Sequence, residues 1–299
     1  MRLLLRALAW LSLRANHAVG AAIGRLVFAF SPRYRACLLA NLASSRLCAS
    51  RQGLRAMARA NAAEMGKAAT ELAWTLFRSP EAAVEKVRSR TGWEAVERLR
   101  AAHRSIVFVT PHLGAYDVMG RYLWAQLPGQ VIGMYRPHKL AWLDEVIREG
   151  RGRGSEVGGD HMVPANLSGV RRLLKHLKAG GCTLVLPDQV PSVGDGEWAD
   201  FFGQPAYTMT LVGRLQHATH AALVFCYAER LPRGEGFVAH FHALETALPD
   251  DRREAAGIVN REVERLVREC PEQYLWGYNR YKRPAGAPPP PACAAGKAA

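Results

Sequence analysis

The chain has 299 residues, 49% of them hydrophobic, and its 40 Lys and Arg outnumber 26 Asp and Glu, which gives a formal net charge of +14. This composition excludes an intrinsically disordered protein, and the length is sufficient for one large domain with a hydrophobic core. The charge favours nucleic acid, anionic lipid or an acidic carrier protein as partner. Because the sequence has no zinc-finger spacing and no RNP-type aromatic motif, nucleic-acid binding is disfavoured.

Residues 1–30 are predicted to form a basic amphipathic helix. A helical wheel gathers the basic residues on one side: Arg2, Arg6, Arg14, His17 and Arg25. The opposite side carries Leu4, Leu8, Leu11, Ala15, Val19, Ala22, Leu26 and Phe30. The uncharged stretches are shorter than the roughly 20 apolar residues of a spanning helix. We therefore expect the helix to lie in an anionic membrane interface. A tilted span with snorkelling arginines and an ordinary helix packed on the core are the alternatives.

Residues 31–102 are predicted to form a helical subdomain, because Ala, Arg, Leu and Glu recur there with helical periodicity and strand formers are few. The expected helices are Arg33–Leu47, Gln52–Phe77 and Gly92–Ala102.

Residues 103–283 are predicted to form a catalytic part in which strands alternate with helices. The expected strands are Ser105–Thr110, Val131–Tyr135, Cys182–Leu186, Ala221–Tyr227 and Gly236–Leu244. The expected helices are Asp117–Gln126, Trp142–Arg148, Gly169–Lys178, Thr208–His217 and Arg253–Cys270. This alternation indicates an α/β fold with a mostly parallel sheet flanked by helices. The Pro-rich residues 284–299 are expected to be a disordered tail.

The first of these strands leads into the residues that carry the chemistry. The strand ends at Thr110, so His112 follows its carboxyl end, where α/β sheets place their ligands. Gly114 permits a tight turn and Asp117 opens the next helix, so the Asp117 carboxylate can reach back to an imidazole nitrogen. His112 would then take a proton from a substrate hydroxyl, which is itself the nucleophile. The structural alternative is a histidine that caps the helix.

The spacing from His112 to Asp117 is weak by itself, since a second histidine, His240, precedes Glu245 by the same interval. That second pair falls in and just after a predicted strand, where side chains five residues apart face opposite ways. The strand–turn–helix context therefore distinguishes the first pair.

Polar residues also follow the next two predicted strands. Arg136 ends the second strand and could hold a phosphate or the developing oxyanion. Asp188 and Gln189 follow the third strand and could bind a sugar or phosphopantetheine edge, or shape a turn. Arg151 and Arg153 lie in a Gly-rich basic stretch that suits phosphates. Solvated surface charge is the alternative for the arginines.

Together these stretches resemble the bacterial lipid A secondary acyltransferases of the lauroyl/myristoyl type, a branch of the glycerolipid acyltransferases with the H-x4-[DE] signature. The matching stretches follow the family order from about residue 100 to 284. They are Thr110-Pro-His-Leu-Gly-Ala-Tyr-Asp117, Met134-Tyr-Arg-Pro137, Gly169-Val-Arg-Arg172, Leu186-Pro-Asp-Gln-Val-Pro191, Phe201-Phe-Gly-Gln-Pro-Ala-Tyr-Thr208 and Pro271-Glu-Gln-Tyr-Leu-Trp276 with Arg280.

The resemblance implies a donor, an acceptor and a place of action. The donor would be an acyl-carrier-protein thioester, and the acceptor a 3-hydroxyacyl group of a lipid A precursor. The place would be the cytoplasmic face of the inner membrane. No bound cofactor is implied, and six cysteines without paired spacing predict no metal site and no disulfide framework.

The resemblance also assigns residues. His112 and Asp117 are the implied catalytic pair, Arg136 lies in the second motif block, and Asp188 with Gln189 is an implied acceptor-site element. Asp117 departs from the Glu of many members by one methylene. Phe201–Tyr207 is expected to help shape an acyl pocket. Two alternatives remain open: an acyltransferase for another lipid, such as an ornithine lipid or a lysophospholipid, and a non-catalytic basic protein that binds membrane or nucleic acid.

Overall fold

The computed structural model describes residues 2–135, 140–152 and 162–291. Within these ranges the chain forms a seven-stranded sheet of order β1-β9-β8-β2-β5-β3-β4. Only the β8–β9 pair is antiparallel among the described pairs of this sheet, which confirms the predicted mostly parallel α/β sheet. The strands are β1 Val87–Thr91, β2 Ile106–Val109, β3 Val131–Tyr135, β4 Met162–Pro164, β5 Cys182–Val185, β8 Ala222–Arg230 and β9 Phe237–Ala243.

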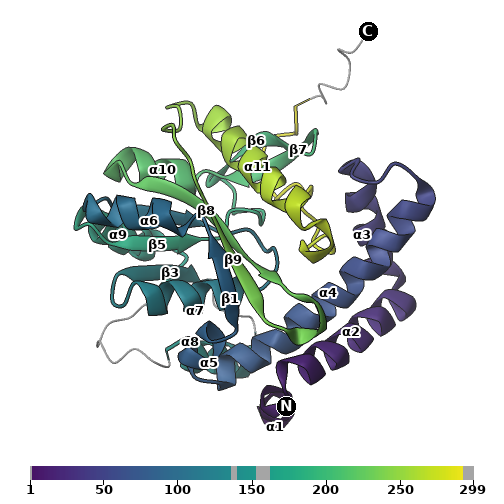
Figure 1. Ribbon diagram of the computed structural model, residues 1–299. Coiled ribbons are helices and arrows are strands. Elements are labelled where there is room, and N and C mark those ends of the chain that lie inside the picture. The colour runs from purple at the N-terminus through teal and green to yellow at the C-terminus, as the bar shows by residue number, and fades with distance from the viewer. Residues whose placement is uncertain (1, 136–139, 153–161, 292–299) are drawn as a thin grey trace.

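Helices cover both faces of the sheet (Figure 1). Helices α6 and α7 pack on the face that carries Ile106 and Phe108 of β2, and α9, α10 and α11 pack on the face that carries Val107. Because both faces are buried, β2 is an uninterrupted apolar run rather than an alternating one. These helices are α6 Trp93–Ala101, α7 Tyr116–Gln126, α9 Leu167–Lys178, α10 Leu211–Thr219 and α11 Arg252–Glu269.

The remaining helices stand at one edge of the molecule, where α2 lies along the long helix α4 (Figure 1). Their contact depends on small residues. A Cβ added at Gly24 of α2 would lie 1.9 Å from the Ala62 carbonyl oxygen of α4, so the two backbones approach closely. These helices are α1 Arg2–Trp10, α2 Leu13–Phe30, α3 Pro32–Ser44, α4 Arg51–Phe77, α5 Pro80–Val84 and α8 Ala141–Gly152.

The N-terminal segment differs from the single helix that the sequence predicts. It breaks after Trp10, and Ser12 caps α2 by accepting a hydrogen bond from the Ala15 N–H. His17 does not belong to an outer basic side: it is buried, with Nε2 2.7 Å from a carboxylate oxygen of Glu71 on α4. None of the helices in the described ranges has both the length and the hydropathy to cross a membrane.

Much of the predicted apolar side of this segment nevertheless faces outward. Since the Gly face of α2 is occupied by α4, its large apolar side chains are left exposed, with Phe30 81% and Leu26 57% accessible. The exposed large hydrophobic residues of α1 and α2 are Leu3, Trp10, Val19, Ile23, Leu26, Val27 and Phe30. We call this set the N-terminal apolar surface. An exposed apolar surface of this kind marks a contact with lipid or with another protein.

Four strands escape prediction from the sequence, each for a physical reason. β1 is a largely exposed edge strand of sequence Val-Arg-Ser-Arg-Thr, which has no apolar alternation, and β4 has three residues and ends in proline. β6 (Gly196–Phe201) and β7 (Gln204–Met209) form a hairpin whose two loop residues, Phe202 and Gly203, both have positive φ. A two-residue turn of this kind fits a hairpin twist. The helix predicted from Thr208 begins only at Leu211, because β7 extends to Met209.

The predicted tail is partly ordered. Ala287 is 1% exposed and packs in a small cluster with Val190 and Trp198. The Trp198 indole N–H donates a hydrogen bond of 3.0 Å to the Pro288 carbonyl. The prediction of a disordered tail is therefore wrong for this part of it, because an aromatic surface offers a Pro/Ala-rich segment somewhere to pack. Residues 292–299 lie outside the described residues.

Candidate active site

The strand register brings His112 and Asp188 together. β2 and β5 are parallel neighbours in which Val109 pairs with Val185. His112 and Asp188 each follow their paired valine by three residues, at the carboxyl edge of the sheet. Segments that continue past the same edge in parallel remain adjacent, and this adjacency places the Asp188 carboxylate beside the imidazole.

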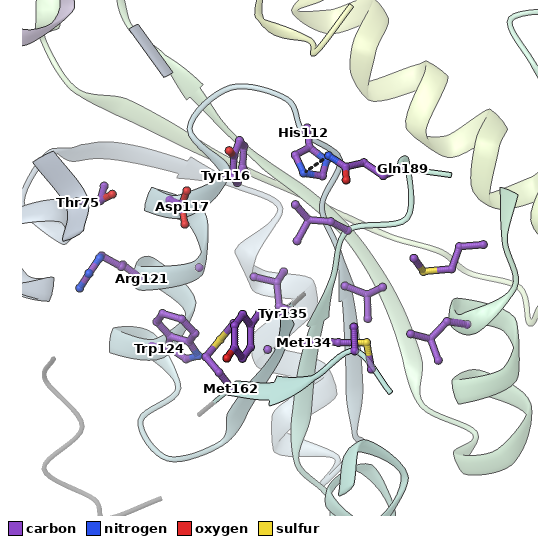
Figure 2. Close-up of a pocket in the computed structure, with 18 of the residues that line it drawn as sticks. Thr75, His112, Tyr116, Asp117, Arg121, Trp124, Met134, Tyr135, Met162 and Gln189 are labelled. Carbon is purple, nitrogen blue, oxygen red and sulfur yellow. Dashed lines mark hydrogen bonds between the residues drawn. The ribbon is translucent and has the colours of Figure 1, made fainter. Parts of the chain in front are cut away.

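Asp188 holds His112 at two points. The His112 backbone N–H donates to Asp188 Oδ2 at 2.9 Å, and His112 Nδ1 lies 2.7 Å from Asp188 Oδ1. An ionised carboxylate only accepts hydrogen bonds, so Nδ1 carries the proton and Nε2 keeps its lone pair. The amide nitrogen of Gln189 lies 3.2 Å from Nε2 (Figure 2). The side chain of Asp188 is 3% exposed and that of His112 is 15% exposed, so the pair is shielded while the ring still reaches the surface of a cavity.

The environment keeps Asp188 ionised. Burial alone would raise the pKa of Asp188, but electrostatic attraction to His112, two hydrogen bonds from His112 and the nearby Arg280 guanidinium together lower it below the usual value. The ionised form of Asp188 is therefore the form present near neutral pH. An ionised partner stabilises the imidazolium that arises when His112 accepts a proton.

Asp117 does not make the contact with the imidazole that the sequence leads us to expect. Both ring nitrogens have partners from the β5 side, Asp188 and Gln189. Asp117 sits in the first turn of α7 and lines the same cavity as His112. Figure 2 shows the Tyr116 ring between the two residues, with ring centroids of His112 and Tyr116 5.0 Å apart. The turn from His112 to α7 thus points the Asp117 carboxylate toward another part of the cavity wall.

The turn that carries His112 depends on a glycine. Gly114 has φ of +59°, and a Cβ there would lie 2.1 Å from the Ala228 carbonyl oxygen of β8. The Gly114 N–H donates to the Gln273 carbonyl at 3.1 Å, and the Ala115 N–H donates to the Ala228 carbonyl at 2.8 Å. The loop is therefore fastened on both sides by backbone hydrogen bonds.

A buried guanidinium supports the same turn. Arg230, at the end of β8, donates to the Gly114 carbonyl at 2.8 Å. Its Nε lies 3.0 Å from each carboxylate oxygen of Glu71, and its Nη2 donates to Glu71 Oε2 at 2.9 Å. It also reaches Glu64 at 3.1 Å. Although burial lowers the pKa of Arg230, the two carboxylates raise it overall, so the charge is retained. Because Glu71 also contacts His17, this network joins α2 and α4 to the loop that positions His112.

A cavity of about 340 Å³ opens beside His112. Figure 2 places His112 and Gln189 at one end of it and Trp124 and Met162 at the other. A lone pair aimed at a cavity, with an ionised carboxylate behind the ring, is a general-base arrangement. No serine or cysteine nucleophile lines this cavity among the described residues, so the geometry suits a base that activates a hydroxyl of the substrate.

Comparison with known proteins agrees with this chemistry. The family model of the bacterial lipid A biosynthesis acyltransferases matches residues 2–283. The chain belongs to this family. It is 28% identical to the lipid A biosynthesis lauroyltransferase of Escherichia coli (strain K12) over 278 residues, which cover 90% of this chain and 86% of the relative.

Other members of the acyltransferase family match over shorter stretches. The lipid A biosynthesis palmitoleoyltransferase of E. coli K12 is 26% identical over 73% of this chain and 68% of its own length. The lipid A biosynthesis myristoyltransferase of the same strain is 29% identical over 64% of this chain and 59% of its own length. These relatives are named for different acyl groups, which indicates that the transferred acyl chain varies within the family.

The other predicted site residues of this acyltransferase fall in different places. Arg136 and Arg153 lie outside the described residues, and Arg151 is described only as part of the backbone of α8. Phe201–Tyr207 does not line the cavity. It forms the β6–β7 hairpin, in which Phe201 and Phe202 are buried in the core against α11 and Tyr207 is buried in the small cluster with Trp198. His240 contacts Glu229 at 3.0 Å, in keeping with an accidental match to Glu245.

Proposed function

We propose that this acyltransferase moves a fatty acyl group from an acyl-carrier-protein thioester to a hydroxyl of a 3-hydroxyacyl chain on a lipid A precursor, at the cytoplasmic face of the inner membrane. The observation that carries the proposal is the His112–Asp188 pair at the end of a cavity, in a chain whose family match spans residues 2–283. The family supports a lipid A-type acceptor, the resemblance suggests the carrier-protein donor, and the geometry supports His112 as the base.

In the proposed reaction the acceptor hydroxyl donates its proton to His112 Nε2 while its oxygen attacks the thioester carbonyl carbon. The tetrahedral intermediate collapses by breaking the carbon–sulfur bond, and the imidazolium returns the proton to the departing thiolate. Asp188 keeps the ring in the tautomer that can accept the proton and stabilises the cation that forms. The products are an ester and a free carrier thiol.

Gln189 and Asp117 are assigned supporting roles. The Gln189 amide N–H occupies Nε2 in the resting site, so the acceptor hydroxyl must displace it. Once displaced, that N–H is available to the oxyanion of the intermediate. We propose that Asp117, which lines the same cavity, binds a polar group of the substrate rather than the ring. The arginines Arg136, Arg151 and Arg153 remain proposed ligands for phosphate groups.

The reaction is tested by its product and by its salt dependence. When the purified protein is incubated with an acyl-carrier thioester and a lipid A precursor, mass spectrometry should detect the precursor with one additional esterified acyl group. Because an acidic carrier would be steered by the +14 charge, kcat/KM should fall steeply with salt for the carrier thioester. The matched control is an uncharged pantetheine-type thioester of the same acyl chain, for which salt should have little effect.

Three outcomes would contradict parts of this proposal. An equal salt effect on both donors would exclude recognition of the carrier protein. Esterification of an ornithine lipid or a lysophospholipid, but not of the lipid A precursor, would show that the proposed acceptor is wrong. Membrane or nucleic-acid binding without turnover of any thioester would show that the protein is a binding protein and not an active acyltransferase.

Membrane contact is proposed for the N-terminal apolar surface. Exposed apolar side chains of α2 adjoin a side that carries Arg14 and Arg25, which suits an interface with anionic lipid. Leu26→Glu together with Phe30→Glu should weaken binding to anionic vesicles about tenfold or more, since two large apolar side chains no longer enter the interface.

The matched control adds the same charges on the arginine side of α2, as Ala18→Glu with Ala29→Glu, where both positions are exposed. This control should lose less binding in co-sedimentation with the same vesicles. Deletion of residues 1–30 is a poorer test, because it also removes His17 from the buried contact with Glu71. Equal binding of the Leu26/Phe30 variant and the unaltered protein would exclude this surface as the membrane contact.

A further inference from the structure

The cavity beside His112 changes character along its length. Four of its polar side chains lie near the base: His112, Tyr116, Asp117 and Gln189. Thr75 and Arg121 line one side of the cavity, and Tyr135 lies at the far end beside Trp124 and Met162. Most of the remaining wall is formed by apolar side chains of α7, β3, β4 and β5, namely Trp124, Met134, Met162, Leu184 and Val185. A pocket that is polar at the reacting end and apolar beyond it suits a molecule with the same division.

A glycine lies at the far end of the cavity. Gly133 of β3 pairs in register with Met162 of β4, and both line the cavity. A Cβ added at Gly133 would lie 2.9 Å from Met162 Sδ and 3.7 Å from Cζ2 of Trp124. Met162 therefore packs directly against the backbone of β3 at Gly133, and a side chain at residue 133 would have to displace it. We call Gly133, Met162 and Trp124 the cavity floor.

We propose that the apolar end of this cavity holds the acyl chain of the thioester donor and that the cavity floor sets the chain length transferred. This inference rests on the proposed acyl transfer. The thioester carbonyl must lie beside His112 Nε2 when the hydroxyl attacks, so the chain attached to that carbonyl extends into the adjoining apolar space. A cavity of about 340 Å³ suits a single chain, whereas the chains of a lipid acceptor can stay in the bilayer.

The floor predicts opposite shifts from two substitutions. Gly133→Val puts methyl groups between Met162 and Trp124, so the preferred donor should become shorter by two or more carbons. Met162→Ala opens the same space, so the preferred donor should become longer. Loss or gain of apolar contact for each methylene changes the preference about fourfold, so two methylenes should shift the product ratio roughly tenfold or more.

The measurement is a competition among saturated carrier thioesters whose chains differ by steps of two carbons, with product masses read by mass spectrometry. Met119→Ala is the matched control for Met162→Ala: Met119 is fully buried in α7 but does not line the cavity. It should lower the melting temperature and total turnover without changing the product distribution. General destabilisation cannot move the two floor variants in opposite directions.

Binding separates failure of this inference from failure of the proposed function. The affinities of free fatty acids of graded length are measured by calorimetry on the unaltered protein and on both floor variants. If the unaltered protein transfers no acyl group, the proposed reaction is wrong. The cavity floor is then still tested by binding, because the fatty-acid length that binds most tightly should shift in the two variants as predicted. An unchanged length optimum in both variants, or a change confined to the acceptor's chain preference, would overturn the assignment of this space to the donor chain.

Discussion

His112→Ala should lower kcat roughly 10²–10⁴-fold, the usual contribution of a positioned general base. The imidazole acts mainly when the proton moves, so KM for the acceptor should change little. The melting temperature should fall only modestly, because the change leaves no large core void and Asp188, although it loses the imidazole, keeps the hydrogen bond from the backbone N–H of residue 112. Initial rates at saturating acceptor, together with thermal melts, check both statements.

The opposing interpretation is a histidine that only maintains the loop after β2. In that case activity would fall in proportion to the folded fraction, and the melting temperature would fall with it. A well-folded His112→Ala protein that turns over at nearly the original rate would exclude His112 as the base.

Asp188→Asn should lower kcat by a similar factor of about 10²–10⁴. The reason is the tautomer. The His112 backbone N–H donates to Oδ2 of Asp188, so an Asn at this position would keep its carbonyl oxygen on that N–H and turn its amide N–H toward Nδ1. Nδ1 would then accept a hydrogen bond, the proton would move to Nε2, and the ring could no longer act as a base toward the cavity.

Asp117→Asn is the matched comparison, because it makes the same chemical change to a carboxylate that lines the same cavity. Its effect on kcat should be smaller than that of Asp188→Asn, and part of it should fall on KM, since Asp117 is assigned to the substrate rather than to the ring. If Asp117→Asn lowers kcat much more than Asp188→Asn does, Asp117 and not Asp188 is the residue that orients the ring.

The sequence predicts the sheet best where burial is most complete. β2 and β5, in which every residue is buried, are predicted within one residue of their observed ends, because short and largely apolar runs leave little choice. β1 was missed because four of its five residues are exposed and carry no periodic signal. An edge strand of this kind gains its conformation from its neighbour β9, which lies far along the chain.

In the candidate site, too, one residue could be placed from the local sequence and the other could not. His112 could be predicted from local context, because a strand, a tight turn and a helix follow each other within a few residues. Its partner could not. Asp117 is near in sequence, whereas Asp188 becomes near only when β5 is known to lie beside β2 in register. Strand order in a parallel sheet is a long-range property, so the single sequence indicates Asp117, not Asp188, as the carboxylate that reaches the ring.

The N-terminal segment shows how a helical wheel can be partly right. The exposed apolar stripe of α2 was expected, and residues such as Leu26 and Phe30 do face outward. His17 was placed on the wrong side, since a wheel treats histidine as polar and exposed while α4 supplies it with the buried carboxylate of Glu71. Small residues set this contact: α2 turns its glycine face to α4, and the large apolar residues are left outside.

The central claim is that His112, oriented by Asp188, is the base for acyl transfer, and the most direct measurement of it is kcat for His112→Ala, Asp188→Asn and the double variant in one assay. Residues that act as a unit are strongly non-additive. The double variant should therefore be no more than a few-fold slower than His112→Ala alone, because Asp188 has no ring left to orient. Losses that multiply in the double variant would show that the two residues act independently, and would contradict the account.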